Sequence, residues 1–166
     1  MVRAVIGLIF FLLLHTDVSS QGKYAGTKKY LIGKTYTELP QIPGLKGWKF
    51  LEGSMLNYIT DPERITVDIF EKGTDRIIIG SIMDDTATGV FKIVDVVEVK
   101  GVMKGWSIRT GSCRQNQLTN TYIIAWGKDV IAEFMNLIKK AWKFNPDKRR
   151  FEVIPVKGID CENIGC

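Results

Sequence analysis

The sequence predicts an α+β fold: an antiparallel β-meander of about six strands, one C-terminal amphipathic helix packed on the sheet, and a final strand. Three observations predict this class. Apolar and polar residues alternate through much of the chain after residue 47. Short turn-like clusters separate the alternating runs, which favours antiparallel neighbours over crossover connections. A single later stretch, 129–143, has helical periodicity instead.

The first six strands are expected at residues 49–59, 63–71, 76–83, 90–100, 106–110 and 121–126. The clearest alternation lies in 63–71, where Ile65, Val67 and Ile69 share one face. Residues 72–75 and 84–89 have turn composition, rich in Gly, Asp and Thr. The only adjacent carboxylates, Asp84 and Asp85, fall in the second turn, so we interpret them as solvated turn residues.

The helix is expected to begin at Asp129, a good N-cap residue. Lysines in its last turns would suit the helix dipole, and residues 145–147 (Asn-Pro-Asp) would end it. The final strand is expected at 151–156. The apolar stripe of the helix would consist of Val130, Ile131, Phe134, Leu137, Ile138, Ala141 and Trp142.

Residues 1–20 have the pattern of a cleaved secretory signal peptide. Arg3 supplies a basic start, residues 4–14 are apolar, and small residues precede Gln21. Eleven helical residues would span about 16 Å, too short for a hydrocarbon core of about 30 Å. The sequence therefore predicts a secreted protein, or one of the periplasm or cell envelope. An irregular leader with one short strand near Tyr36 would follow at 21–47, and a single α+β domain at 48–166.

The only histidine, His15, lies inside the predicted signal. The mature chain would therefore contain none, which excludes Ser-His-Asp and Cys-His catalysis and any His-ligated metal. No phosphate loop or dinucleotide fingerprint occurs. We accordingly assign no catalytic residue, no metal site and no cofactor. Ser112 with Lys128 would be the nucleophile arrangement still open without histidine, although nothing in their spacing requires it.

Three cysteines remain, Cys113, Cys161 and Cys166, and an oxidising compartment should pair two of them. Pairing of Cys113 with Cys161 would pin the C-terminal end to the sheet, and we favour it over a small terminal ring of Cys161 and Cys166. Cys166 would then be a spare thiol, at a frayed end or in a disulfide-linked dimer. A zinc site is not expected, because no close Cys-x-x-Cys pair exists.

Asp95 interrupts an apolar register formed by Phe91, Ile93, Val97 and Val99. If that face is buried, this acid needs a partner or has a raised pKa. A local bulge or an ion pair with a Lys or Arg would explain it more simply than catalysis. The alternative is a hydrolase that uses carboxylates such as Asp95.

The net charge is +5, and it stays +5 after cleavage because the signal holds one residue of each sign, Arg3 and Asp17. Six basic residues cluster at the end of the predicted helix and in the following turn. A cluster of this kind can bind phosphate, sulfated glycan, an anionic wall polymer or an acidic protein. It can equally be a solvated face. Nucleic acid is not expected as the partner of an exported protein. The cluster, at the helix end and the following turn, consists of Lys139, Lys140, Lys143, Lys148, Arg149 and Arg150.

One internal echo occurs. Residues 45–55 (LKGWKFLEGSM) align with 103–113 (MKGWSIRTGSC), with identities at the Lys-Gly-Trp and Gly-Ser positions. The match ends outside this window. It marks either two similar turn-strand units or a coincidence.

Residues 105–166 resemble a group of small exported proteins, mostly bacterial and uncharacterised. The resemblance implies no activity, but it adds support to pairing of Cys113 with Cys161, since those proteins have a Cys in both places. The loop at 117–120 departs from the pattern, so the resemblance assigns no site there. The shared segments, in order, are 111–114 (GSCR), 123–125 (IIA), 140–143 (KAWK), 150–152 (RFE), 156–158 (VKG) and 161–163 (CEN).

Taken together, the sequence predicts an exported, non-enzymatic binding domain. Its partner would be an anionic polymer or an acidic protein, bound through the basic cluster. Two alternatives stay open: the carboxylate hydrolase, and an inhibitor or effector that acts through an exposed loop at 114–120.

Overall fold

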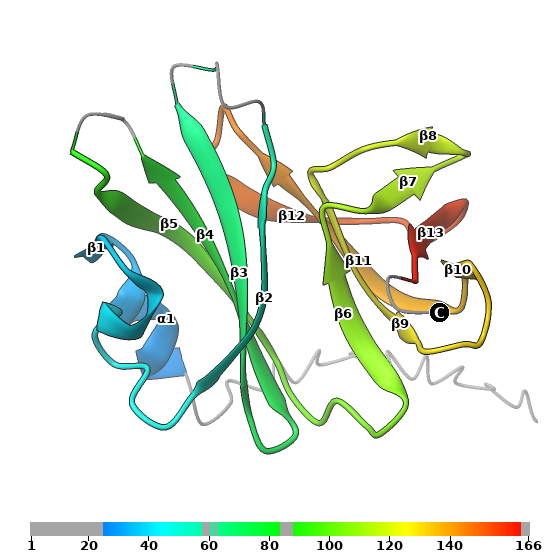
Figure 1. The fold of residues 1–166 in the computed structure, drawn as a ribbon, viewed down its shortest axis with the longest axis horizontal. Coiled ribbons are helices and arrows are strands. Elements are labelled where there is room, and N and C mark those ends of the chain that lie inside the picture. Colours follow the sequence, from blue (N-terminus) through cyan, green and yellow to red (C-terminus); the bar gives the residue numbers. More distant parts are fainter. Residues whose placement is uncertain (1–24, 58–60, 62, 84–87, 164–166) are drawn as a thin grey trace, which may run out of the picture.

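The computed structural model describes residues 25–57, 61, 63–83 and 88–163. In this part of the chain the fold is nearly all β, with thirteen strands, one α-helix of seven residues and one short 3-10 helix. Two antiparallel sheets face each other, and smaller elements cover their outer sides (Figure 1). The predicted α+β class is therefore wrong.

The first sheet has the order β1-β5-β4-β3-β2 and forms the left half of Figure 1. Gly73, with φ of 61°, makes the two-residue turn between β3 and β4. Alternation in β3 sends Ile65, Val67 and Ile69 to the inner face and Phe70 to the outer one. The strands are β1 (Thr35–Tyr36), β2 (Lys49–Met55), β3 (Arg64–Lys72), β4 (Asp75–Met83) and β5 (Phe91–Val99).

The second sheet has the order β12-β11-β9-β6, and a small third sheet has the order β10-β13-β7-β8. The second sheet consists of β6 (Trp106–Thr110), β9 (Ile123–Lys128), β11 (Ile138–Asn145) and β12 (Arg150–Ile154). The third consists of β7 (Cys113–Gln115), β8 (Leu118–Thr119), β10 (Phe134–Met135) and β13 (Ile159–Glu162).

The largest core lies between the first and second sheets. It includes Val67 and Ile78 from one sheet and Ile124, Trp142 and Phe144 from the other, all at most 3% exposed. Burial of each such side chain contributes about 1.5–3 kcal/mol. A second core lies under the leader, and a third joins the second sheet to the small third sheet. The fold is thus layered, with three cores between successive layers.

The predicted helix at 130–142 does not exist. This segment contains a loop, β10 and β11. In the second sheet β11 lies between β9 and β12 and pairs with both. The supposed apolar stripe does not face one core, because Ile131 and Leu137 are exposed. Without β11 the second sheet would be split, so long-range strand pairing outweighs the local helical periodicity.

The six strands predicted between residues 49 and 126 all coincide with observed strands, and β12 overlaps the predicted final strand. Strands β7, β8, β10, β11 and β13 were not predicted. The leader, expected to be irregular, contains α1 (Ala25–Leu31), β1 and the 3-10 helix Leu39–Gln41. Its apolar residues, including Leu31, Tyr36 and Ile42, pack on the outer face of the first sheet.

Cys113 and Cys161 form a disulfide across 48 residues, which confirms the favoured pairing and excludes the Cys161–Cys166 ring. The predicted signal 1–20, the Asp84-Asp85 pair and Cys166 lie outside the described residues. Within those residues, no helix has the length and apolar character needed to cross a membrane.

Candidate functional site

The two large sheets meet along two seams, where a strand at the edge of one sheet, or next to it, lies beside an edge strand of the other. We call the meeting of β5 with β12 the closed seam and the meeting of β2 with β6 the open seam. Neither has a backbone ladder among the described residues. In each, one carboxylate crosses from the first sheet and accepts a backbone N–H of the second.

Asp95 bridges the closed seam. The register shift in β5 places this residue at a bulge, and its side chain is only 9% exposed. Its Oδ2 accepts the Phe151 N–H at 2.8 Å, and its Oδ1 lies 2.7 Å from Lys28 Nζ and also accepts the Val96 N–H. Both carboxylate oxygens therefore have partners. A bulge and an ion pair are both present, and Asp95 has the geometry of a structural bridge.

Apolar packing fills the rest of the closed seam. The rings of Phe144 and Phe151 form a T-shaped, edge-to-face pair there, with ring centroids 5.2 Å apart. Gly80 lies directly beneath them, and a Cβ on Gly80 would stand 2.8 Å from the Phe144 ring and 3.0 Å from that of Phe151. The absence of a side chain at Gly80 lets these two rings close the seam.

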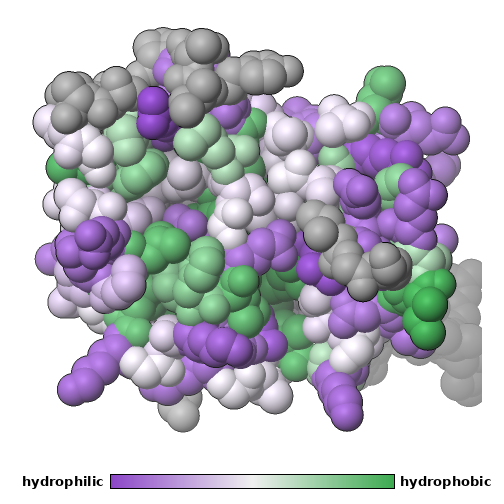
Figure 2. All heavy atoms as spheres, in the orientation of Figure 1, coloured by the Kyte–Doolittle hydropathy of each residue, from purple (hydrophilic) through white to green (hydrophobic). Residues whose placement is uncertain are grey.

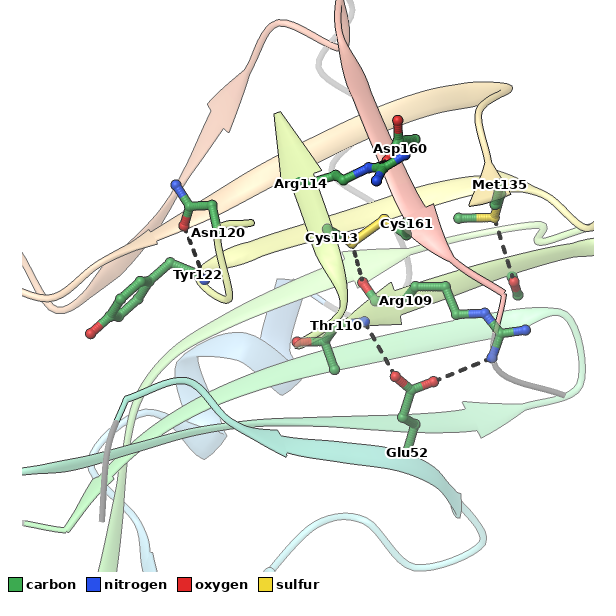
Figure 3. Close-up of a disulfide and its surroundings, with 11 residues drawn as sticks. Glu52, Arg109, Thr110, Cys113, Arg114, Asn120, Tyr122, Met135, Asp160 and Cys161 are labelled. Atoms are coloured by element: carbon green, nitrogen blue, oxygen red, sulfur yellow. Dashed lines mark hydrogen bonds and ion pairs between the residues drawn. A yellow bond between two sulfur atoms is a disulfide. The ribbon is translucent and has the colours of Figure 1, made fainter. Parts of the chain in front are cut away.

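Glu52 bridges the open seam. It too follows a bulge, at residues 50–52 of β2, but its side chain is 27% exposed. Its Oε1 accepts the Thr110 N–H at 3.2 Å, and its Oε2 lies 3.7 Å from Arg109 Nη1. Figure 3 shows this carboxylate between the Thr110 backbone and the Arg109 guanidinium, below the disulfide. Burial raises the pKa of Glu52 above its usual value, although these two partners oppose the shift.

The internal echo maps onto the open seam. Its two copies contain β2 and β6, which run side by side in the same direction (Figure 1). Equivalent positions meet, since Glu52 and Thr110 occupy the same place in the two copies and share a hydrogen bond. Ser54 lies so close to Gly111 that a Cβ there would be 2.6 Å from its hydroxyl. The echo was the sequence signal for this site.

Unpaired polar atoms concentrate at the open seam. Seven buried side-chain polar atoms lack a hydrogen-bond partner among the described residues. Three of them, Arg109 Nε, Thr110 Oγ1 and Ser112 Oγ, lie within four consecutive residues. These same residues line a groove of about 500 Å³ together with Glu52 and Ser54. Because buried polar groups are normally satisfied, such a cluster indicates unused binding capacity.

A second hollow of about 240 Å³ continues the groove where β2 and β6 diverge (Figure 1). Ile69, Trp106 and Ile108 form apolar walls that reach the core between the sheets, while Arg76 and Arg109 supply charge. Beside it, the side chains of Leu51 and Met55 on β2 are 42% and 41% exposed. Figure 2 shows hydrophobic surface near the middle of this face, bordered by hydrophilic residues. The open seam is thus amphipathic and accessible.

The six basic residues expected to form one patch at a helix end are dispersed. They lie on β11, β12 and the turn between them. In that turn Lys148 and Arg150 both pair with Glu152, and Arg149 pairs with Glu63. These contacts hold the pKa of Glu152 at about 2, below its usual value, chiefly through the Lys148 hydrogen bond. Three of the six cations are therefore paired with two carboxylates, which leaves one net positive charge among these five residues.

The other three cations, Lys139, Lys140 and Lys143, have no carboxylate partner within the described parts of the chain. Lys139 Nζ lies 4.2 Å from the centroid of the Trp126 ring and 5.9 Å from that of Trp106. Lys140 Nζ lies 5.2 Å from that of Trp142. A register shift between Ile138 and Lys140 accompanies this arrangement. Lys143 stands opposite Ile123 in the β9–β11 pair, so the two side chains lie on the same face of the sheet. Because Ile123 faces the third sheet, Lys143 points away from Lys139 and Lys140.

A further buried carboxyl lies under the leader. Asp68, 6% exposed, accepts a hydrogen bond from the Tyr36 hydroxyl at 3.1 Å. Burial raises the pKa of Asp68 to about 6, and burial beside this carboxylate raises the pKa of Tyr36. Asp68 was not singled out in the sequence, because its alternating strand made it look like a solvent-facing residue.

Other sequence candidates are separated by the fold. Lys128 stands opposite Trp106 at the start of β6, whereas Ser112 lies beyond the strand's far end, so the two do not meet. The loop 114–120 contains a small hairpin of β7 and β8, with Leu118 75% exposed at its edge. No group of three or more potential metal ligands occurs in the described residues.

Comparison with known proteins gives no relative. No family model, no curated protein and no solved structure matches this chain. The resemblance of residues 105–166 to small exported proteins therefore stays a prediction, and the function has to be argued from the geometry alone.

Proposed function

We propose that this protein is an exported, non-enzymatic binding protein that holds its ligand in the groove of the open seam. One observation carries the proposal: Arg109, Thr110 and Ser112 line the same groove and each has a buried polar atom without a partner. Export rests on the pattern of residues 1–20, and a disulfide between buried cysteines suits an oxidising compartment.

The chemistry of the groove favours binding over catalysis. Glu52 is bonded to Arg109 and to a backbone N–H, so it is held as an acceptor rather than poised beside a nucleophile. Among the described residues, no base lies within hydrogen-bond distance of the Thr110 and Ser112 hydroxyls. Arg109, Thr110 and Ser112 supply donors, Glu52 supplies an acceptor, and Leu51 supplies apolar contact.

The test separates binding from stability. Thr110→Val and Ser112→Ala remove hydroxyls that have no partner, so the double variant should be as stable as the wild type or about 1 kcal/mol more stable. A ligand that uses these hydroxyls should lose at least tenfold in affinity. Thermal-shift measurements would screen a panel of oligosaccharides, short peptides and amphipathic small molecules against both proteins, because a ligand raises the melting temperature of the form it binds.

The matched control is Val153→Ala, which alters an exposed residue on the edge strand of the closed seam. The proposal is supported if hits shift the wild type and this control but not the double variant. It is wrong if no compound class distinguishes the double variant from the wild type.

Binding of an anionic polymer is a second candidate, and the unpaired state of Lys139, Lys140 and Lys143 favours it. Replacing these three by Ala should lower the salt needed for elution from a sulfated polysaccharide, relative to a plain cation exchanger. Replacing Lys148, Arg149 and Arg150 is the charge-matched control, since these cations already pair with Glu63 and Glu152. Equal losses in both variants would show generic charge attraction.

A further inference from the structure

The open seam presents two strand edges that lack strand partners. β2 ends the first sheet and β6 ends the second, and no backbone hydrogen bond joins them among the described residues. In the described part of the chain, the Thr110 N–H of β6 donates to the Glu52 carboxylate of β2. Backbone N–H and C=O groups on a free edge are a template for another extended chain.

The shape of the seam fits one end of such a chain. β2 and β6 converge near Ser54 and Gly111, where no strand can enter, and diverge toward Lys49 and Trp106 (Figure 1). The hollow of about 240 Å³ opens in this divergent part and reaches Ile69 in the core. That volume accepts a single large apolar side chain, while the main chain that carries it lies along β2.

The charges of the divergent part favour an acidic ligand. Arg76 and Arg109 both line the hollow, with Glu52 as its only carboxylate. Arg76 pairs with Glu71 at 3.0 Å, whereas Arg109 has carboxylates only at 3.7 and 4.0 Å, from Glu52 and Asp129. These distances are long for an Arg–carboxylate pair. Lys139, whose Nζ lies 5.9 Å from the ring centroid of Trp106, adds a positive charge near this wall of the hollow.

We infer that the open seam binds an extended acidic peptide, which adds a strand to the free edge of β2, inserts an apolar side chain between Ile69 and Trp106, and places a carboxylate against Arg109. This inference rests on the function proposed above and names its ligand class. A neutral small molecule would fill one hollow only. It would leave the free edge and the exposed Leu51 and Met55 unused.

The experiment begins with peptide display against the oxidised protein, using two randomised libraries that differ in one fixed central residue, Glu or Lys. The Glu library should enrich sequences with apolar residues near the acid. The best peptide is then synthesised, and its affinity is measured by calorimetry with each backbone nitrogen methylated in turn. Strand addition requires alternate N–H groups, so methylation at every second position should cost tenfold or more and the others less than about threefold.

Variants of the protein test whether Arg109 binds the carboxylate of the peptide's Glu. Changing the peptide's Glu to Gln should cost about tenfold against the wild type and against Lys148→Ala, an exposed control, but little against Arg109→Gln. Arg109→Lys should restore part of the preference, since it keeps the charge and loses the planar fork. Near-UV circular dichroism would establish that each variant is folded.

Three results would overturn the inference. They are enrichment of the Lys library at least equal to that of the Glu library, an N-methyl scan without alternation, and an acid preference that persists in Arg109→Gln. If another compound class still distinguishes the Thr110→Val/Ser112→Ala variant, the groove remains a binding site with a different ligand. If none does, the proposed function itself fails.

Discussion

The two seams of this protein share the same bridging arrangement but differ in how completely side chains fill them. Each joins a strand of the first sheet to an edge strand of the second. In each, a carboxylate beside a bulge in the first-sheet strand accepts a backbone N–H of the second sheet. At the closed seam Asp95 also has a lysine partner, and the rings of Phe144 and Phe151 fill the remaining space. At the open seam the bridge is Glu52, and grooves remain beside it.

The difference shows how one structural device serves both stability and recognition. A nearly buried carboxylate whose two oxygens both have partners closes a sandwich. The same group with longer contacts, beside unpartnered hydroxyls and an accessible hollow, leaves hydrogen-bonding capacity for a ligand. What separates the two seams is packing: aromatic rings over Gly80 on one side, and the small residues Ser54 and Gly111 on the other.

Loss of the disulfide should have the largest effect. Cys113 follows β6 by three residues, so the bond to Cys161 anchors the end of the open seam. Replacing both cysteines by Ala should lower the free energy of unfolding by about 4 kcal/mol on the chain-entropy model for a 48-residue separation. Urea denaturation in a Cys166→Ser background would measure this. Hydrogen exchange should quicken more at the Thr110 amide than at the Phe151 amide; equal acceleration would remove the distinction between the seams.

Filling Gly80 should break the closed seam. Val at this position would place its Cβ within 3.0 Å of two aromatic rings, and Phe144 is fully buried and has no space to move into. We expect a loss of about 3 kcal/mol in stability from overpacking. Thermal denaturation measures it, with Gly89→Val as the control, since that position is open but has a positive φ. A loss no larger than the control's would show that the aromatic pair can shift.

The buried carboxyl outside both seams gives a pH signature. Because the pKa of Asp68 is about 6 in the folded state, against about 3.8 when unfolded, folding favours its protonated form. Its stabilising contribution is therefore present below about pH 4 and is lost as the pH rises through 6. Asp68→Asn should be on the order of 2–3 kcal/mol more stable than the wild type at pH 7.5 and about equal to it at pH 4. Denaturant titrations at both values measure this, and a pH-independent difference would refute it.

The two bridging carboxylates should respond unequally to neutralisation. Asp95→Asn should cost about 2 kcal/mol, because a buried, charge-assisted bond to Phe151 is weakened and Lys28 loses its partner. Glu52→Gln should cost less than about 1 kcal/mol, since its contacts are longer and partly solvated. Urea denaturation of both variants at neutral pH provides the comparison, and equal losses would mean that the open seam depends on its bridge as much as the closed one.

Local patterning was sufficient for the strands that alternate over short turns. The two strands predicted within residues 63–83 are correct because β3 and β4 are adjacent in sequence and each has one apolar face toward the central core. The helix at 130–142 was wrong because apolar residues at intervals of three and four also occur where a loop joins a short strand to β11. The segment forms a strand because it pairs with the edge of β9 that β6 does not occupy.

The candidate site, like the fold, could be predicted from the sequence only in part. The sequence singled out Asp95 by its position in an apolar register, and it recorded the echo that contains Glu52 and Thr110. It could not show that the two echo copies lie side by side, because 58 residues separate the bonded positions. Nor could it show that Glu63 and Glu152 pair with three of the six basic residues.

By itself, then, the sequence determined the strands between residues 49 and 126 and the oddity of Asp95, because these depend on residue type and short-range spacing. It also favoured the correct cysteine pair, because an oxidising compartment should pair two of the three cysteines. The tertiary structure alone decided which seam is filled and which is left open, since that depends on how Phe144, Phe151 and Gly80 meet across two sheets. Contacts between residues far apart in the chain leave no periodic trace in it, and the candidate binding groove is made of such contacts.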